Sequence, residues 1–274
     1  MEHHGKNHPK IVVAVIPARY ASVRLPGKML LPIGGRPLIL WTVEQVRQAR
    51  TVSRVIVATD DPRIFDVVSE NGCESMMTSS DHRSGTDRVA EVAECIPEAS
   101  IIVNVQGDEP LIAPATIDAA VDALVSDEAA DMSTTSEPIQ NIDEILNGNV
   151  VKVVVGENAN AIYFSRSPIP FPRDASLRHN GDANEAVLSE PGLFSIFRKH
   201  TGLYVYRREY LLRFSKLPQT KLEQTEMLEQ LRAIEDGAKI KVVEAACRSI
   251  GVDTQEDLDR VRQILKAVVI ENIS

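Results

Sequence analysis

Apolar runs alternate with amphipathic stretches along the first half of the chain. Runs of mostly β-branched apolar residues lie within 11–16 (IVVAVI), 54–58 (RVIVA) and 100–105 (SIIVNV), a pattern typical of strands buried on both faces of a sheet. A shorter strand is expected at 75–78. Helical spacing or helix-start signals predict helices at 38–49, from Pro62, at about 84–96 and at 114–126. This alternation predicts a doubly wound, Rossmann-like, mostly parallel α/β sheet.

The regular alternation ends after Asp131. Further strands are expected at 132–135, 150–155, 161–165, 200–206 and 239–245. One amphipathic helix is expected over 223–236, with Met227, Leu228, Leu231 and Ile234 as its core stripe, and a last helix follows Asp253. The region 168–198 is rich in Pro, Gly, Asn and charged residues and has no clear period, so a flap or insertion is expected there. We therefore predict a disordered tail (1–10) and one domain (11–274), made of parts 11–130, 131–252 and 253–274.

Composition and charge exclude several classes of function. The 274 residues are 43% hydrophobic, enough for a sizeable core, and the net charge of −9 argues against nucleic acid as a partner. No apolar run approaches the roughly 20 residues of a membrane-spanning helix, and the N-terminus has no apolar signal-peptide core. The three cysteines are far apart and indicate neither a disulfide framework nor a zinc site. A soluble, cytoplasmic protein without membrane insertion is expected.

Three cations follow the first predicted strand directly: Arg19, Arg24 and Lys28. In an open α/β sheet the ligand crevice lies beyond the carboxyl ends of the strands, so cations gathered there favour a polyanion such as a triphosphate. The alternative is an ordinary solvated loop. A P-loop is disfavoured, because Met29 follows Gly27-Lys28 where a magnesium-binding hydroxyl would stand.

Two aspartates form a candidate metal site. Asp108 lies at the end of the strand 100–105, in the segment Gln106-Gly107-Asp108-Glu109-Pro110, and Asp253 precedes the last helix. Carboxylates combined with substrate phosphates suit Mg²⁺. Alternatively, Asp108 is a turn residue and Asp253 the cap of the last helix. Together with the cationic loop, the two aspartates favour a metal pair.

Seven segments spread over nearly the whole chain carry a family resemblance. In order they are VAVIPARYASVRLPGK, DHRSGTDRVAEV, NVQGDEP, YFSRSPIP, HTGLYVYR, EMLEQLR and GVDTQEDL. With these segments the chain resembles the 3-deoxy-D-manno-octulosonate (KDO) cytidylyltransferases, also called CMP-KDO synthetases, which use Mg²⁺ and CTP to activate KDO for lipopolysaccharide biosynthesis. CMP-sialic acid synthetases are similar in the first loop but not in EMLEQLR.

The resemblance implies a role for each candidate residue. Lys28, Asp108 and Asp253 would be catalytic, with Asp108 and Asp253 holding Mg²⁺. The nucleotide would be bound by Arg19, Arg24, Lys28, Thr59, Asp60, Arg83 and Ser84. The sugar acid would be bound by Gln106, Arg166, His200, Tyr204, Glu229 and Gln230. The alternative for the last group is that they are ordinary strand residues or the polar face of a helix.

The resemblance further implies a nucleotidyltransferase fold, with a mainly CTP-binding half at 11–130 and a smaller sugar-binding and dimerisation lobe at 131–252, in a homodimer. The expected reaction is direct: the anomeric hydroxyl of KDO attacks the α-phosphate of CTP and pyrophosphate leaves, with catalysis by positioning and charge neutralisation. Two alternatives stay open. The acceptor could be 8-amino-KDO or sialic acid, or the chain could be a non-catalytic nucleotide-binding scaffold, which the presence of both aspartates and all three cations disfavours.

Overall fold

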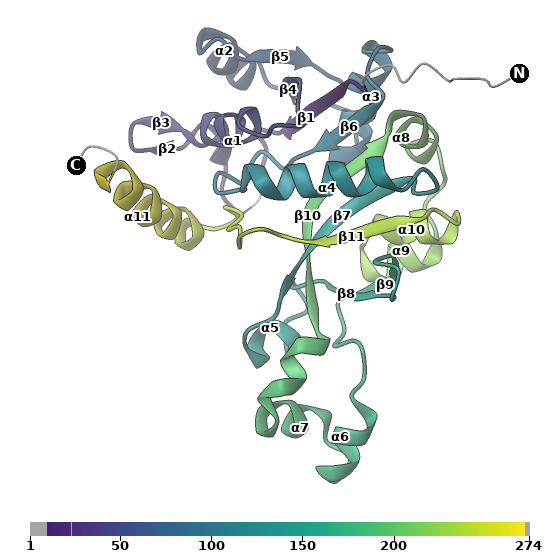
Figure 1. The fold of residues 1–274 in the computed structure, drawn as a ribbon. Coiled ribbons are helices and arrows are strands. Elements are labelled where there is room, and N and C mark those ends of the chain that lie inside the picture. Colours follow the sequence, from purple (N-terminus) through teal and green to yellow (C-terminus); the bar gives the residue numbers. More distant parts are fainter. Residues whose placement is uncertain (1–9, 23, 272–274) are drawn as a thin grey trace, which may run out of the picture. The chain divides into compact units, whose positions relative to one another are not determined.

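The computed structural model describes residues 10–22 and 24–271 (Figure 1). The disordered tail predicted at 1–10 lies outside the described residues except for Lys10. The chain divides into two compact units: the first comprises Met1–Pro114, Tyr206–Ser215 and Ile250–Ser274, the second Ala115–Val205 and Lys216–Ser249. Neither unit is one continuous stretch of sequence. Among the described helices, none combines the length and the apolar composition that crossing a membrane requires.

A parallel sheet with strand order β6-β1-β4-β5 forms the first unit. Its strands are β1 (Val12–Ala18), β4 (Arg54–Thr59), β5 (Glu74–Met77) and β6 (Ile101–Asn104). Every residue of β1 is buried, as its unbroken apolar sequence predicts. The strand continues two residues beyond its predicted end, since Pro17 and Ala18 still pair with Ala58 and Thr59 of β4. Arg19 therefore begins the cationic loop directly at the carboxyl edge of the sheet.

Helices and one hairpin complete the first unit. They are η1 (Lys28–Leu30), the hairpin β2 (Pro32–Ile33) and β3 (Arg36–Pro37), α1 (Leu38–Arg47), α2 (Pro62–Glu70), α3 (Gly85–Cys95), α8 (Arg208–Phe214) and α11 (Gln255–Glu271). The hairpin turns through Gly34 and Gly35, whose φ angles of 59° and 82° are those a two-residue turn demands of glycine. At the start of α3, Ser84 and Asp87 form the predicted reciprocal cap.

The second unit mixes parallel and antiparallel pairing. Its strands are β7 (Met132–Pro138), β8 (Lys152–Val155), β9 (Ala161–Ser165), β10 (Arg198–Arg207, with its last two residues in the first unit) and β11 (Ile240–Glu244). β11 pairs parallel with β7, whereas β8 pairs antiparallel with β9 and β10. The helices are α4 (Pro114–Ser126), α5 (Ile142–Leu146), α6 (Arg173–Arg178), α7 (Ala183–Ser189), η2 (Pro191–Ile196), α9 (Lys221–Glu226) and α10 (Gln230–Glu235). The predicted α/β fold with a mostly parallel sheet is confirmed.

The region 168–198 is not the irregular flap expected from its composition. It folds into α6, α7 and η2, and Val187 and Phe197 pack with Ile139 and Ile145 in a small apolar cluster. Asp182 caps α7 by accepting hydrogen bonds from two backbone N–H groups. Helices of six or seven residues are too short to show a helical period in sequence, which explains the error.

The single helix predicted over 223–236 is also wrong, because the chain breaks it at Met227. There φ is 53°, a left-handed conformation, and α9 and α10 lie on either side. Met227 is 75% exposed rather than part of the core stripe, while Leu228 and Leu231 are buried as expected. The apolar periodicity of 223–236 correctly predicts that Leu228 and Leu231 are buried. A periodicity carries no information about a break of the helix at a single residue.

Candidate active site

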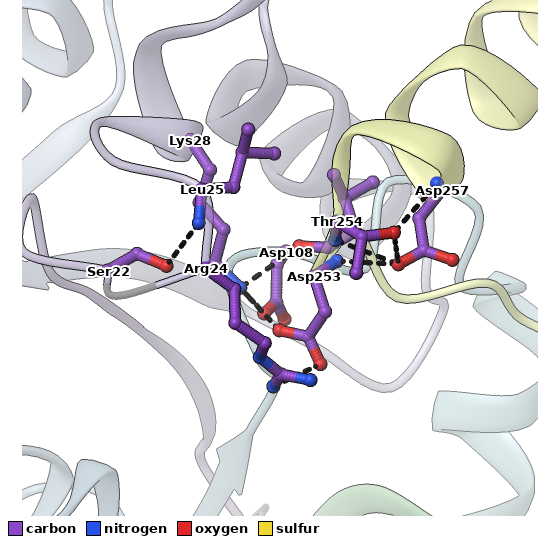
Figure 2. Close-up of polar contacts among 9 residues, drawn as sticks. Ser22, Arg24, Leu25, Lys28, Asp108, Asp253, Thr254 and Asp257 are labelled. Atoms are coloured by element: carbon purple, nitrogen blue, oxygen red, sulfur yellow. Dashed lines mark hydrogen bonds and ion pairs between the residues drawn. The ribbon is translucent and has the colours of Figure 1, made fainter.

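Four charged side chains of the first unit converge at the carboxyl edge of its sheet (Figure 2). The Lys28 ammonium donates to Asp108 Oδ2 at 2.5 Å and to Asp253 Oδ1 at 2.9 Å. Its third hydrogen bond goes to the Val252 carbonyl at 3.0 Å. Arg24 Nη2 donates to the other oxygen of Asp253, Oδ2, at 2.9 Å. One cationic group therefore contacts both predicted metal ligands.

A tightly packed turn positions Asp108. A Cβ on Gly107 would lie 3.1 Å from the Pro17 carbonyl oxygen and equally close to the side chains of Met29 and Ile39, so only glycine fits without displacing backbone. The Thr42 hydroxyl donates to the Gly107 carbonyl at 2.9 Å. The Asp108 carbonyl in turn accepts from the Val252 N–H at 2.9 Å, which brings the segment with Asp253 alongside.

The helix-cap alternative for Asp253 is not what the structure shows. The cap of α11 is Thr254, whose Oγ1 accepts from the Asp257 N–H at 3.2 Å while Asp257 Oδ2 accepts from the Thr254 N–H at 2.9 Å. The Asp253 carboxylate is thereby left to Lys28 and Arg24 (Figure 2). Its part in the cluster does not compete with capping.

The cluster of two cations and two carboxylates is electrically balanced. Burial alone would lower the pKa of Lys28, but the ion pairs with Asp108 and Asp253 outweigh it and raise that pKa above its ordinary value. Burial alone would raise the pKa of Asp253, and the hydrogen bonds and charges of Lys28 and Arg24 instead lower it. Both groups are therefore ionised at neutral pH. The Lys28 side chain is only 9% exposed, whereas that of Arg24 is 65% exposed.

The donor set fits a hard divalent cation. The ammonium of Lys28 is itself a stand-in cation that touches both Asp108 and Asp253. Within residues 10–22 and 24–271 no group of three or more His, Cys, Asp or Glu side chains is arranged for a metal. Two carboxylates, completed by phosphate oxygens and water, are the set that Mg²⁺ commonly takes beside nucleotides.

The residues predicted to line the nucleotide surround the start of α3. Arg19 Nη2 donates to the carbonyl oxygens of His82 and Ser84, at 2.8 and 3.0 Å, and so ties the cationic loop to this segment. Thr59 and Asp60 stand at the end of β4, and Arg83 is exposed. Asp60 accepts at 2.7 Å from Arg88, which sequence reasoning missed. The available signal was a charged residue on the core-facing stripe of an amphipathic helix.

Arg166 of the second unit is held by the chain break at Met227. Its guanidinium donates to the carbonyl oxygens of Glu226, Gly148 and Met227, at 2.6, 2.9 and 3.3 Å. The Glu226 carboxylate accepts from the Ser165 hydroxyl at 2.5 Å and from the Arg166 N–H at 2.9 Å. Glu226 was not predicted, and no sequence signal distinguishes it from the other charged residues of its helix.

His200 and Tyr204 lie together on β10. His200 Nε2 is 2.9 Å from Thr134 Oγ1, and its ring packs against Phe164 and Tyr204 with centroids 5.0 and 5.4 Å apart. Burial lowers the pKa of His200 to about 3, so its imidazole is neutral. Burial, and secondly the charge of Glu229, raises the pKa of Tyr204, which keeps its proton. The two rings therefore offer hydrogen-bonding groups without charge.

Two other residues predicted for the sugar acid, Glu229 and Gln230, lie at the start of α10, and Glu229 is close enough to Tyr204 for its charge to raise the pKa of that phenol. Glu229 accepts from Arg232 Nη2 at 2.9 Å, and Gln230 is buried at the start of α10. Gln106 belongs to the first unit, where its Nε2 lies 3.3 Å from Asn104 Oδ1. The predicted sugar-binding residues are thus divided between the two units.

Comparison with known proteins identifies the family of the chain. A family model described as "Cytidylyltransferase" matches residues 13–240. A protein of Geobacter sulfurreducens named 3-deoxy-manno-octulosonate cytidylyltransferase is 51% identical over 255 residues, 93% of this chain and 99% of its own. One of the same name from Trichlorobacter lovleyi is 49% identical over 255 residues, covering 93% and 98%.

A solved structure is similar over the same extent. It is that of a CMP:2-keto-3-deoxy-manno-octonic acid synthetase complexed with CTP, which is 40% identical, covers 94% of this chain and 99% of its own, and has a TM-score of 0.84. The resemblance recognised in the seven sequence segments is thereby confirmed. The chain belongs to the cytidylyltransferase family of nucleotidyltransferase enzymes.

Proposed function

We propose that this enzyme transfers the cytidylyl group of CTP to KDO, giving CMP-KDO and pyrophosphate for lipopolysaccharide biosynthesis. The observation that carries the proposal is the 49–51% identity to relatives of that activity, over 93% of this chain and 98–99% of theirs. Similarity of this extent spans nearly the whole chain. The cluster of Lys28, Asp108, Asp253 and Arg24 supplies the matching chemistry.

The reaction is an in-line displacement at phosphorus. The anomeric hydroxyl oxygen of KDO forms a bond to the α-phosphorus of CTP, the bond to pyrophosphate breaks, and the hydroxyl proton is released. Because such a transfer needs little covalent chemistry from the protein, the protein contributes positioning and compensation of charge. Arg24 and Lys28 are the cations available for this at the strand edge, and Arg19 fixes the loop that carries them.

We propose Mg²⁺ as the cofactor, held by Asp108 and Asp253. Bound there, it would supply positive charge that compensates the triphosphate and orients its oxygens. Lys28 donates to both carboxylates, so its ammonium must exchange partners if Mg²⁺ is to bind there. Phosphate oxygens are acceptors to which a lysine ammonium binds well. The exchange keeps the ammonium hydrogen-bonded throughout.

For the sugar acid we propose recognition by Gln106, Arg166, His200, Tyr204, Glu229 and Gln230. A neutral imidazole and a protonated phenol suit the hydroxyl groups of a sugar, because each can donate or accept a hydrogen bond without a bound charge. Arg166 is the cation of the set and suits the carboxylate of the sugar acid. A charged amino group in place of a hydroxyl, as in 8-amino-KDO, would favour Glu229 as its partner.

We propose that the enzyme works as a homodimer in the cytoplasm. Phe171, Leu177 and Leu188 of the region 168–198 are 65%, 63% and 56% exposed, and large apolar side chains exposed within one segment favour an interface. Sedimentation of the purified enzyme tests the dimer. The free thiols of Cys95 and Cys247 are exposed, which suits a reducing compartment, and cell fractionation tests the location.

A pyrophosphate-release assay tests the function. It crosses CTP, UTP, ATP and GTP with KDO, 8-amino-KDO and sialic acid, with Mg²⁺ and with a chelator. The expected result is fastest turnover with CTP and KDO and none with the chelator. Faster turnover of another nucleotide or sugar acid would replace the corresponding substrate in the proposal, and activity in the chelator would remove the metal from it.

A further inference from the structure

A fully buried arginine lies beneath the proposed nucleotide site. Arg88 of α3 has 0% side-chain exposure, and its Nη2 donates to Asp60 Oδ2 at 2.7 Å. Its Nη1 donates to Thr78 Oγ1. Asp60 directly follows β4 and Thr78 directly follows β5, so a single guanidinium joins the carboxyl ends of two neighbouring parallel strands. Ligands bind outside this edge in open α/β sheets.

The stability of the fold does not account for Arg88. Removing a guanidinium from water is unfavourable, and well-packed apolar side chains in place of a buried ion pair are often as stabilising or more so. Arg88 Nε has no hydrogen-bond partner among the described residues, which adds to the penalty. The feature that an apolar replacement could not reproduce is the fixed position of the Asp60 carboxylate, whose side chain is 21% exposed and reaches solvent.

The surrounding hydrogen bonds make this position rigid. The Thr78 hydroxyl donates to the Thr59 carbonyl at 3.1 Å, so its oxygen is available to accept from Arg88. The Thr78 N–H donates to the same carbonyl at 2.9 Å, and the Asp61 N–H donates to Thr59 Oγ1 at 3.2 Å. The backbone on both sides of Asp60 is therefore anchored, and Arg88 holds one oxygen of its carboxylate.

We propose that Arg88 is a positioning residue that fixes Asp60 as a hydrogen-bond acceptor for the nucleoside of the substrate. The inference rests on the proposed function, because it concerns the same nucleotide site. An ionised carboxylate only accepts hydrogen bonds. It therefore favours a donor on the nucleoside, which is either the 4-amino group of cytosine or the 2′-hydroxyl of the ribose. If the donor is the 4-amino group of cytosine, the Asp60 carboxylate disfavours uracil, whose 4-oxygen is an acceptor.

The test uses three variants, Arg88→Lys, Asp60→Asn and the double substitution, with KM for CTP, KM for KDO, kcat and the CTP-to-UTP preference as readouts. Asp60→Asn removes the charge-assisted hydrogen bond between Asp60 and the nucleoside, and Arg88→Lys displaces it. In both variants KM for CTP should therefore rise roughly ten- to a hundredfold. KM for KDO should be unchanged. Since Arg88 acts through Asp60, the double variant should equal Asp60→Asn alone. Substrates lacking one donor, UTP and 2′-deoxy-CTP, identify the group that Asp60 recognises.

Arg54→Lys is the matched control. Arg54 also joins β4 to β5, through Glu74 at 2.5 Å, but at the amino ends of both strands. The Arg54→Lys substitution should leave every kinetic constant unchanged. Equal changes in KM for both substrates, a lower kcat with unchanged KM for CTP, or additive effects in the double variant would overturn the inference.

Two further measurements distinguish a failure of this inference from a variant that does not fold and from a failure of the proposed function. If Arg88→Lys does not fold, Asp60→Asn alone decides, because an unchanged preference for CTP over both UTP and 2′-deoxy-CTP would exclude Asp60 from nucleoside recognition. If the wild-type enzyme does not use KDO, the proposed function fails. Calorimetry of CTP binding to the wild type and to Arg88→Lys then still tests the inference, and equal affinities would overturn it.

Discussion

The predicted site residues of the two units are held in opposite ways. In the first unit Lys28, Asp108, Asp253 and Arg24 hold one another, so their charges are compensated within the cluster. In the second unit three candidates have partners outside the candidate set, although His200 and Tyr204 also pack against each other. Arg166 donates to backbone carbonyls, His200 lies beside Thr134, and Glu229 pairs with Arg232.

The difference indicates two modes of ligand binding. A cluster whose charges compensate one another must exchange partners when a polyanion and a metal arrive, so binding there is a competition between ion pairs. Residues held by neighbouring groups of the protein keep their positions when a ligand binds. Binding there depends on a preorganised shape and on hydrogen-bonding groups that are already oriented towards the ligand. Substitutions in the first unit should therefore alter the chemistry, and those in the second the choice of acceptor.

The largest expected effect is at the two aspartates. Asp108→Asn and Asp253→Asn keep the shape but remove the charge that would hold the proposed Mg²⁺, so each should nearly abolish turnover. Because Thr254 and Asp257 cap α11, Asp253→Asn should leave that cap intact. The matched control is Asp259→Asn, an exposed partner of Arg262 on the same helix. Pyrophosphate release and thermal melting are the measurements, and normal turnover of either variant would remove that residue from the metal site.

Lys28→Met should affect two ligands in opposite directions. It removes a contact to phosphate, so kcat/KM for CTP should fall roughly ten- to a hundredfold. It also removes the resident cation from Asp108 and Asp253, so Mn²⁺ should bind more tightly than to the wild type when no nucleotide is present. Electron paramagnetic resonance of free Mn²⁺ measures the second effect. Lys241→Met, which loses a 2.9 Å ion pair with Asp127, is the control. Unchanged Mn²⁺ affinity would show that the ammonium does not compete with metal.

The sequence predicted the sheet of the first unit better than the second unit. Long apolar strands and a capping box such as Ser84 with Asp87 are local signals, and the structure confirms them. The short helices of 168–198 and the left-handed break at Met227 depend on contacts distant in sequence, among them the small cluster around Phe197 and the bonds from Arg166. No window of sequence contains those contacts.

The same distinction applies to the candidate site. The cationic loop and Asp108 could be placed at one edge of the sheet because they follow predicted strands. That Lys28 contacts both carboxylates could not be predicted, since these contacts join side chains 80 and 225 residues apart. The cap of the last helix is a local feature instead, because Thr254 and Asp257 have the spacing of a capping box. Arg88 lies on the core-facing stripe of α3, which is a signal in the sequence, but its partners Asp60 and Thr78 belong to other elements and are visible only in the structure.

In the second unit, His200→Ala and Glu229→Ala should change use of the sugar acid rather than of the nucleotide. Each removes one hydrogen-bonding group, so KM for KDO should rise about tenfold, while CTP affinity measured by calorimetry stays the same. Glu190→Ala, a surface carboxylate that pairs with Arg178, is the control for Glu229. Normal KDO kinetics in both variants would assign the two residues to the scaffold alone.

The smallest expected effect is on stability and tests the preorganisation of the second unit. The pKa of His200 is lowered to about 3 in the folded chain, below its ordinary value of 6.5. Between these values the unfolded chain binds a proton that the folded chain does not, so stability falls as the pH falls from 6.5 towards 3. The slope contributed by this one site is at most about 1.4 kcal/mol per pH unit. His200→Gln retains hydrogen-bonding atoms without the titration, so its unfolding free energy in urea should depend less on pH from 6.5 to 4.5. Equal pH dependence of the wild type and His200→Gln would mean that His200 is hydrated when folded, and the contrast between the two units would then rest on Arg166 and Glu229 alone.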